Sequence, residues 1–255
     1  MLYKIIFEIE KKQEINLTYN ISSLFHGFLM EQINPAFATE MHAMNLRPYS
    51  QHLHFADNRI FWMVCALNDR VYENLGQPLL ENSLQTITLK HKKLELPILS
   101  KSVKSISLEN FLDKTFWAEH SRLVTVHFLT PCSFKTQGKY LFYPTVKHII
   151  QSLAMKFDAA GYDYSVYTPE MVADLAENVS IVQYNLRSKK FQLEGVKIPA
   201  FVGNITLKTY GTSQIASLLH MLLAFGEYSG IGIKCALGMG AVKMEERGAR
   251  HNGQK

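Results

Sequence analysis

The stretch GEYSGIGIKCALGMGAVKM, Gly226–Met244, holds five of the 14 glycines in this 255-residue chain. Glycine loses more backbone freedom on folding than any other residue, so glycines concentrate where the chain turns sharply or approaches another group closely. A helix-type apolar pattern precedes the stretch, and the strand-type segment AVKME (241–245) ends it. This order of helix, glycine-rich loop and strand is the starting point for predicting the fold.

The spacing of the glycines excludes two common nucleotide-binding loops. A dinucleotide fingerprint requires G-x-G-x-x-G between a strand and a helix, but Cys235 stands where the third glycine is needed, and the order of elements is reversed. A P-loop requires G-x-x-x-x-G-K followed by serine or threonine, whereas Lys234 is followed by Cys235. We therefore expect no nucleotide cofactor.

Two uses of these glycines stay open. In the first, they serve the fold: Gly230 ends a helix, Gly232 forms a turn, and Gly238 and Gly240 permit close packing. In the second, backbone N–H groups of the loop bind phosphate oxygens of an anionic chain, and Lys234 adds positive charge. Spacing alone favours the first use slightly.

Outward from this loop, apolar periodicity predicts one order of elements twice: strand, helix, strand, strand, helix and a closing strand. In the first half the predicted strands are 2–10, 49–56, 60–67 and 84–106, and the predicted helices are 22–33, 36–44, 70–80 and 107–119. In the second half the predicted strands are 122–131, 179–186, 191–197, 201–210 and 241–245, and the predicted helices are 145–159, 169–177 and 215–230.

This order predicts an α+β fold made of two tandem ferredoxin-like (βαββαβ) domains. The predicted units are residues 1–121, residues 122–246 and a polar tail, 247–255. Because no repeat is visible at the level of residue identity, a single mixed α+β domain is the alternative.

Composition limits the class of protein. Hydrophobic residues make up 47% and charged residues 19% of the chain, as in ordinary globular proteins, and the net charge of +5 suits an anionic partner without requiring one. Three cysteines without a C-x-x-C pair exclude a disulfide framework and a cysteine-rich zinc site. The charged N-terminus and the lack of an apolar run of about 18 residues predict a cytoplasmic protein without a membrane span.

The glycine loop, with G-x-G, a lysine and L-G-M-G before a final strand, resembles the signature loop of the CRISPR repeat-processing endoribonucleases of the RAMP superfamily. Three other stretches resemble segments of the same family: Thr130–Phe157 (TPCSFKTQGKYLFYPTVKHIIQSLAMKF), Phe201–Gly211 (FVGNITLKTYG) and Asn34–Ser50 (NPAFATEMHAMNLRPYS). The resemblance is dense from Val124 to Met244 and thinner in the first half.

The resemblance implies cleavage of precursor CRISPR RNA within its repeats, without a metal or cofactor. The ribose 2′-hydroxyl beside the scissile phosphate is the nucleophile, so the products carry a 5′-hydroxyl and a 2′,3′-cyclic phosphate or 3′-phosphate. The protein then has to align the attack, move protons and stabilise the added charge on phosphorus. Implied partners are the repeat RNA, as precursor and product, and subunits of a CRISPR interference complex; the assembly is left open between monomer and homodimer.

The resemblance also implies catalytic residues. His42 follows the pattern N-P-x-x-A-x-x-M-H and corresponds to the family's histidine, and histidine suits proton transfer near neutral pH. His26 is the candidate second group, and Arg47 is the nearest cation in the sequence. The family often has a lysine shortly after its histidine, but none occurs between His42 and Lys90.

The expected RNA-binding residues lie in the second half. They are Gly230, Gly232, Lys234, Gly238 and Gly240 in the glycine loop, and Lys135 and Lys139 near the start of the predicted domain. Two histidines of one predicted strand, His52 and His54, lack further ligands at zinc spacing, so no metal site is expected. A non-catalytic RNA-binding subunit with the same fold is the alternative function, and a nucleotide-binding α+β enzyme is the third.

Overall fold

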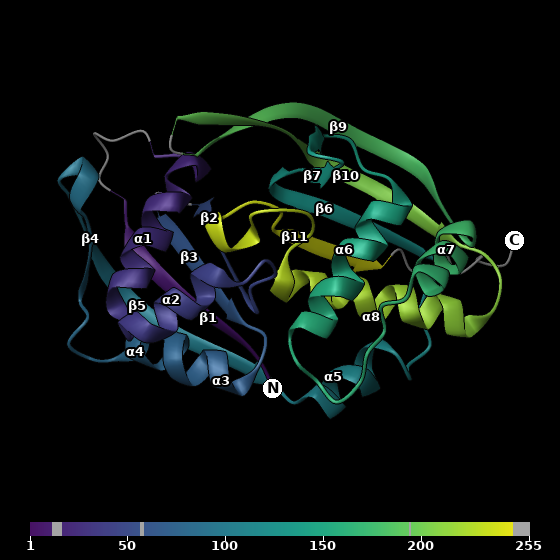
Figure 1. Cartoon of the computed structure of the whole chain (residues 1–255), viewed down its shortest axis with the longest axis horizontal. Coiled ribbons are helices and arrows are strands. Elements are labelled where there is room, and N and C mark those ends of the chain that lie inside the picture. Colours follow the sequence, from purple (N-terminus) through teal and green to yellow (C-terminus); the bar gives the residue numbers. More distant parts are fainter. Residues whose placement is uncertain (12–16, 57–58, 194, 247–255) are drawn as a thin grey trace, which may run out of the picture.

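The computed structural model describes residues 1–11, 17–56, 59–193 and 195–246. Two main antiparallel sheets, each covered by helices, lie side by side, one formed by each half of the chain (Figure 1). The predicted polar tail, 247–255, lies outside the described residues, as do residues 57 and 58 between the predicted strands 49–56 and 60–67.

The first half forms a five-stranded sheet in the order β2-β3-β1-β5-β4. Its elements are β1 (Leu2–Glu10), a 3₁₀ turn (Tyr19–Ile21), α1 (Ser22–Gln32), α2 (Pro35–Ala43), β2 (Tyr49–Ala56), β3 (Arg59–Ala66), α3 (Asp69–Val71), a π-helical turn (Tyr72–Gly76), α4 (Gln77–Leu80), β4 (Thr86–Leu89), a 3₁₀ turn (Lys90–Lys92) and β5 (Leu94–Ile106). Strands β2, β3, β1 and β5 have the ferredoxin-like order, and β4 is added at the edge.

The second half forms a four-stranded sheet in the order β11-β6-β10-β9, which is again ferredoxin-like. Its elements are α5 (Leu108–Thr115), β6 (Leu123–Cys132), β7 (Phe134–Thr136), β8 (Lys139–Leu141), α6 (Val146–Ala159), α7 (Pro169–Glu177), β9 (Val179–Leu193), β10 (Val196–Thr209), α8 (Ser213–Ser229), a 3₁₀ turn (Cys235–Leu237) and β11 (Val242–Glu246). The predicted α+β class with two ferredoxin-like units is confirmed.

Each sheet has its own apolar core. Trp62, Phe7 and Phe25 are fully buried in the first half, and Phe157 and Phe225 are buried in the second. The domain boundary between residues 121 and 122 stays a prediction. Helix α5 precedes that boundary, yet its Phe111 belongs to the apolar cluster of the second half.

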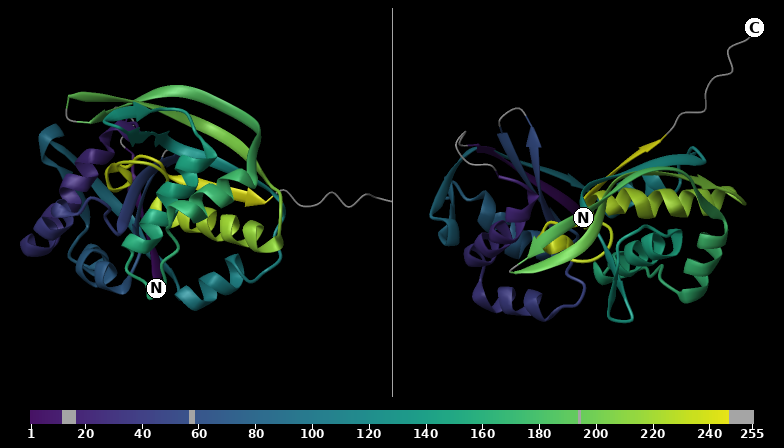
Figure 2. Two further views of the ribbon diagram at one scale, coloured as in Figure 1. Left: turned by 45° about the vertical axis from the view of Figure 1, so that its right-hand side comes forward. Right: turned by 90° about the horizontal axis from the view of Figure 1, so that it is seen from above.

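The three strands predicted across 179–210 are wrong in number, because β9 and β10 form one long two-stranded ribbon. Ser188–Lys190, which lies between two of the predicted strands, continues β9 and pairs with β10. Its side chains are exposed, so the apolar alternation that marks a strand is missing. The ribbon reaches across to the first half (Figures 1 and 2), where the Asn20 side chain accepts a hydrogen bond from the Gln192 N–H at 3.1 Å.

The glycine loop between α8 and β11 also reaches the first half, and its turn Cys235–Leu237 packs against α1 and β2 (Figure 1). Gly238 has φ +103° and lies so close to α1 that a Cβ atom would stand 2.3 Å from the Ser22 Cβ. At Gly240, with φ +67°, a Cβ atom would stand 1.9 Å from the Ile231 carbonyl oxygen. Close packing and positive φ therefore require glycine at both positions.

Helices of the described residues lack the combination of length and apolar character that crossing a membrane requires.

Candidate functional site

A cleft lies where α1 and α2 face the glycine loop. One pocket of about 500 Å³ is lined by His26, His42, Arg47 and Lys234, among others. An adjoining pocket of about 370 Å³ shares His42, Arg47 and Lys234 with the first. The three residues predicted as catalytic are thus brought together with two of the predicted RNA-binding residues, Gly232 and Lys234. We call these two pockets the histidine cleft.

Local sequence places His42 at the wall of this cleft. The Asn34 side chain accepts a hydrogen bond from the Ala36 N–H at 2.9 Å and caps α2, while Pro35 occupies the first turn. Both features stabilise a helix start. Helix α2 then ends at Ala43, so His42 lies in its last turn with its side chain exposed to the cleft.

His26, by contrast, is buried on α1. Its Nε2 lies 2.9 Å from the Tyr49 hydroxyl, and its ring stacks on that of His42 with 6.0 Å between centroids. Burial, and then the positive charges of Arg47 and His42, lower the pKa of His26 to about 4. Burial raises the pKa of Tyr49 to about 12. At neutral pH both groups are therefore uncharged and share one hydrogen bond.

Arg47 connects α2 to β2 and is half-buried. Its Nε donates a hydrogen bond to the Met41 carbonyl at 2.9 Å, which holds the guanidinium in the cleft beside His42. Tyr49 also lines this cleft but was not predicted. As the first residue of a buried strand, it has no feature in the sequence that separates it from a core tyrosine.

The glycine loop uses its glycine N–H groups internally. These groups donate to protein acceptors: Gly230 to the Gly226 carbonyl, Gly232 to the Ser152 hydroxyl, Gly238 to the Cys235 carbonyl and Gly240 to the Pro131 carbonyl. The phosphate cradle predicted from the four glycines is therefore not built from their own N–H groups. The glycines shape the loop, as in the first of the two uses.

Three further residues of the loop line the cleft. In the described part of the chain, no acceptor is found for the N–H of Lys234, Cys235 or Ala236, all of which line the cleft. Lys234 has φ +59° and an exposed side chain. This short segment combines backbone donors with a positive charge, which is a suitable arrangement for an oxyanion.

A third pocket, of about 260 Å³, extends the cleft along α6. It shares Lys156 and Gly232 with the histidine cleft and is lined at its other end by Lys135 and His148. Lys135 therefore lies on a continuous path from His42. Lys139, on β8, lines none of these three pockets.

Lys156 was not predicted as a site residue. Its Nζ donates to the Gly230 carbonyl and lies beside the Cys235 Sγ, both at 2.9 Å, so it fixes the base of the glycine loop. Helical spacing places Lys156 among the apolar residues of α6. A lysine at such a position indicates a buried cation with a partner, and this pattern could have identified it.

The two strand histidines considered for zinc differ in environment. His52 is buried, and burial lowers its pKa to about 3, while His54 is exposed. Among the described residues, no third ligand joins them in a cluster.

Comparison with known proteins confirms the resemblance. The family model for the CRISPR-associated endoribonuclease Cas6 matches residues 126–242. The Cas6 endoribonuclease of Streptococcus thermophilus is 31% identical over 88% of this chain and 90% of its own length. That of Mycobacterium tuberculosis is 29% identical over 86% of this chain and 70% of its own length.

The fold is also that of solved Cas6 structures. A Cas6 product complex superposes with a TM-score of 0.78 and 21% identity, covering 96% of this chain and all of that one (100%). With the two similar sheets and the Streptococcus thermophilus relative, the conclusion on family is direct: the chain belongs to the CRISPR-associated endoribonuclease Cas6 family.

Proposed function

We propose that this protein cleaves precursor CRISPR RNA within its repeats by metal-independent attack of a ribose 2′-hydroxyl. The products carry a 5′-hydroxyl and a 2′,3′-cyclic phosphate or 3′-phosphate. The observation that supports this proposal most is the meeting of His26, His42, Arg47 and Lys234 in one cleft. Proton-transfer groups and cations are what such an in-line displacement needs when the substrate supplies its own nucleophile.

In this proposal His42 is the main proton-transfer residue. The 2′-oxygen loses a proton as it bonds to phosphorus, and the 5′-oxygen gains one as its bond to phosphorus breaks. The protein must therefore accept one proton and donate another on opposite sides of the phosphorus atom. His42 is exposed in the cleft and can reach an RNA backbone there. An imidazole can act in either direction near neutral pH.

His26 is the second member of the pair. Burial keeps its ring neutral at pH 7, and the Tyr49 hydroxyl holds its Nε2. It lines the cleft next to His42 and stacks on its ring. His26 is therefore suited to orient His42 and is poorly suited to carry a positive charge at neutral pH.

Arg47 and Lys234 supply positive charge for the phosphorane. The lysine that the family has shortly after its histidine is missing from this sequence. Lys234, from the glycine loop, lies in the same pocket as His42 and is proposed to take that electrostatic role. Preorganised cations contribute most where charge develops in the transition state.

The RNA backbone next to the cleavage site is proposed to run along the cleft toward Lys135. The path runs from His42 past Lys156 to Lys135 and His148. Lysines along such a path bind phosphates without reading sequence.

The test uses the protein with a repeat RNA in excess EDTA, beside the same RNA carrying a 2′-deoxy nucleotide at the cleavage site. We expect cleavage of the first RNA, no cleavage of the second, and binding of both. Cleavage of the deoxy substrate would contradict 2′-hydroxyl attack. Binding without cleavage of either RNA would replace the proposal with the non-catalytic RNA-binding subunit. Circular dichroism in EDTA confirms that the protein stays folded.

A further inference from the structure

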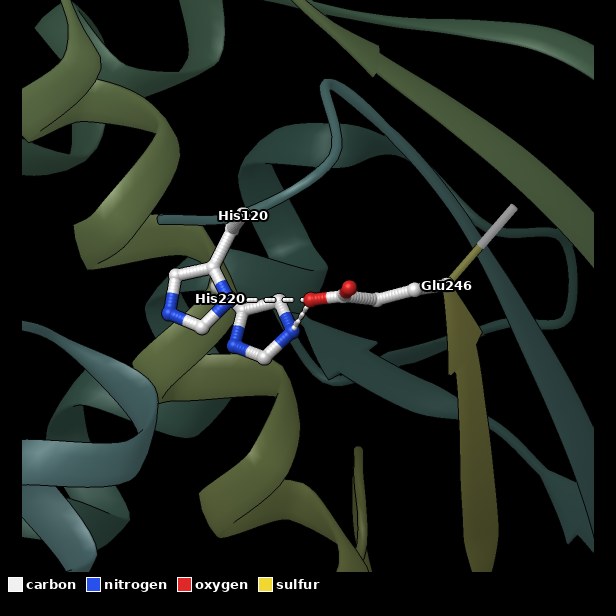
Figure 3. Close-up of side chains that lie close together, drawn as sticks. All are labelled: His120, His220 and Glu246. Carbon is white, nitrogen blue, oxygen red and sulfur yellow. Dashed lines mark hydrogen bonds and ion pairs between the residues drawn. The ribbon is translucent and has the colours of Figure 1, made fainter. Parts of the chain in front are cut away.

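Three side chains from separate segments meet at the end of β11, away from the histidine cleft (Figure 3). His120 lies in the connection between α5 and β6, His220 on α8, and Glu246 is the last residue of β11. Their candidate ligand atoms all lie within 4.8 Å of one another. None of the three lines the histidine cleft or its extension.

The two imidazole rings are packed face to face, 3.5 Å apart and 11° from parallel. His120 Nδ1 is 2.9 Å from Glu246 Oε1, and His220 Nε2 contacts the same oxygen. Figure 3 shows both rings beside a single carboxylate oxygen. The same three atoms can serve as ligands of a cation. Because the lone pair of an imidazole nitrogen lies in the ring plane, one ring has to turn out of the stack for both nitrogens to reach one ion.

Protein groups alone leave this cluster incompletely satisfied. The side chains of His120 and His220 are only 5% and 9% exposed. Within the described residues, His120 Nε2 has no hydrogen-bond partner, whereas His220 has the Thr115 backbone and the Glu246 carboxylate as partners. Buried polar groups normally have partners.

We propose that His120, His220 and Glu246 bind a divalent cation of the zinc class, with water as the fourth ligand. Two imidazole nitrogens and one carboxylate oxygen are a typical zinc donor set, whereas Mg²⁺ and Ca²⁺ prefer oxygen ligands. Tetrahedral bonds of about 2.0–2.1 Å separate donor atoms by roughly 3.3 Å. The His120–Glu246 pair, at 2.9 Å, and the still shorter His220–Glu246 contact are closer than this value, while no two candidate ligand atoms lie more than 4.8 Å apart, so one ion fits after the carboxylate moves away from the rings.

The role of this ion is structural. It joins the α5–β6 connection, α8 and the end of β11, which pairs only with β6 at the edge of its sheet. A pocket of about 430 Å³ next to His120, lined also by Trp117 and Arg122, gives solvent access to the site. Metal-dependent stability and metal-independent cleavage can therefore occur in one molecule.

The experiment uses full-length, tag-free protein stripped with a chelator, then given Zn²⁺ or Co²⁺ and desalted. Wild type is expected to retain about one ion per chain, to show the visible absorption of tetrahedral Co²⁺, and to melt several degrees higher with Zn²⁺. His220→Ala and Glu246→Gln are expected to lose all three responses. His127→Ala is the matched control. His127 on β6 pairs with Glu245 on β11, the residue before Glu246, but its side chain is exposed and it has no third ligand in the described residues.

Wild type without bound metal, or variants that bind as wild type does, would overturn the proposal. If His220→Ala fails to fold by circular dichroism, Glu246→Gln decides, because the Glu246 side chain is partly exposed and its loss leaves the core intact. Glu246→Gln is also expected to cleave repeat RNA at the wild-type rate in EDTA. A failure of the metal site is thereby distinguished from a failure of the proposed cleavage.

Discussion

His42 and His26 are stacked neighbours with opposite exposure, and this difference separates their contributions at the residue scale. His42 meets solvent in the cleft, while His26 is held under it by Tyr49. A pair of titratable groups placed in unlike environments is typical of acid–base catalysis.

Replacement of His42 tests the assignment directly. We expect His42→Ala to slow single-turnover cleavage of repeat RNA about 10²–10⁴-fold, the usual contribution of a general acid or base, with nearly unchanged RNA affinity. His54→Ala is the control, since His54 is an exposed histidine of β2 outside the cleft. If His42→Ala cleaved the RNA at the wild-type rate, the assignment of His42 as a catalytic residue would be wrong.

The buried His26 also makes stability depend on pH. Its pKa is lowered from 6.5 to about 4 in the folded state, so the unfolded chain binds its proton first as the pH falls. The free energy of unfolding is expected to drop by roughly 2–3 kcal/mol from this group between pH 6.5 and 4. Urea denaturation at each pH measures the slope, and His26→Gln should flatten it; an unchanged slope would contradict the buried, neutral state.

At the scale of elements, the glycine loop leaves almost no room for side chains at its glycine positions. Gly238 meets the Ser22 Cβ at 2.3 Å if a Cβ is added, and its φ of +103° strains any other residue. We expect Gly238→Ala to lower the free energy of unfolding by about 2–4 kcal/mol. Gly27→Ala, in the middle of α1 with nothing within 4 Å of the added atom, is expected to be neutral or to stabilise by about 0.5–1 kcal/mol. If urea denaturation gave the same change in the free energy of unfolding for Gly238→Ala and Gly27→Ala, the close packing of Gly238 on Ser22 would be contradicted.

The same loop shows what sequence patterns can and cannot provide. The caps and apolar spacing of α2 and α6 are local, so both helices could be predicted from Asn34-Pro35 and from Thr145 with its following apolar residues. The β9–β10 ribbon could not, because its exposed strands are stabilised by backbone pairing rather than by a buried face. Element order was sufficient for the α+β fold.

At the scale of the whole molecule, the cleft unites residues that are far apart in the chain. The family pattern located His42 in the sequence, but its meeting with Lys234 depends on the docking of the loop against β2. Tyr49 and Lys156 were missed for the same reason, because only tertiary packing turns a strand tyrosine and a helix lysine into cleft residues.

Two lysines of the second half test the proposed RNA path. Lys135 lies on the extension of the cleft, whereas Lys139 does not line it. The logarithm of RNA affinity should fall with the logarithm of salt concentration, and Lys135→Gln should reduce that slope by about 0.7, the value for one phosphate contact of a single strand. Lys139→Gln should leave the slope close to that of wild type. A larger change of the slope for Lys139→Gln than for Lys135→Gln would contradict an RNA path along the cleft.

The reach of the glycine loop into the first half has a consequence for synthesis on the ribosome. His26, His42 and Arg47 are synthesised well before Lys234 and the loop that completes the cleft. A nascent chain that stops before the loop holds the two histidines without the lysine, and Ser22 without Gly238 packed on it. Under the proposed mechanism, the catalytic site therefore forms only after the glycine loop has been synthesised, so chains that stop before the loop have no nuclease activity.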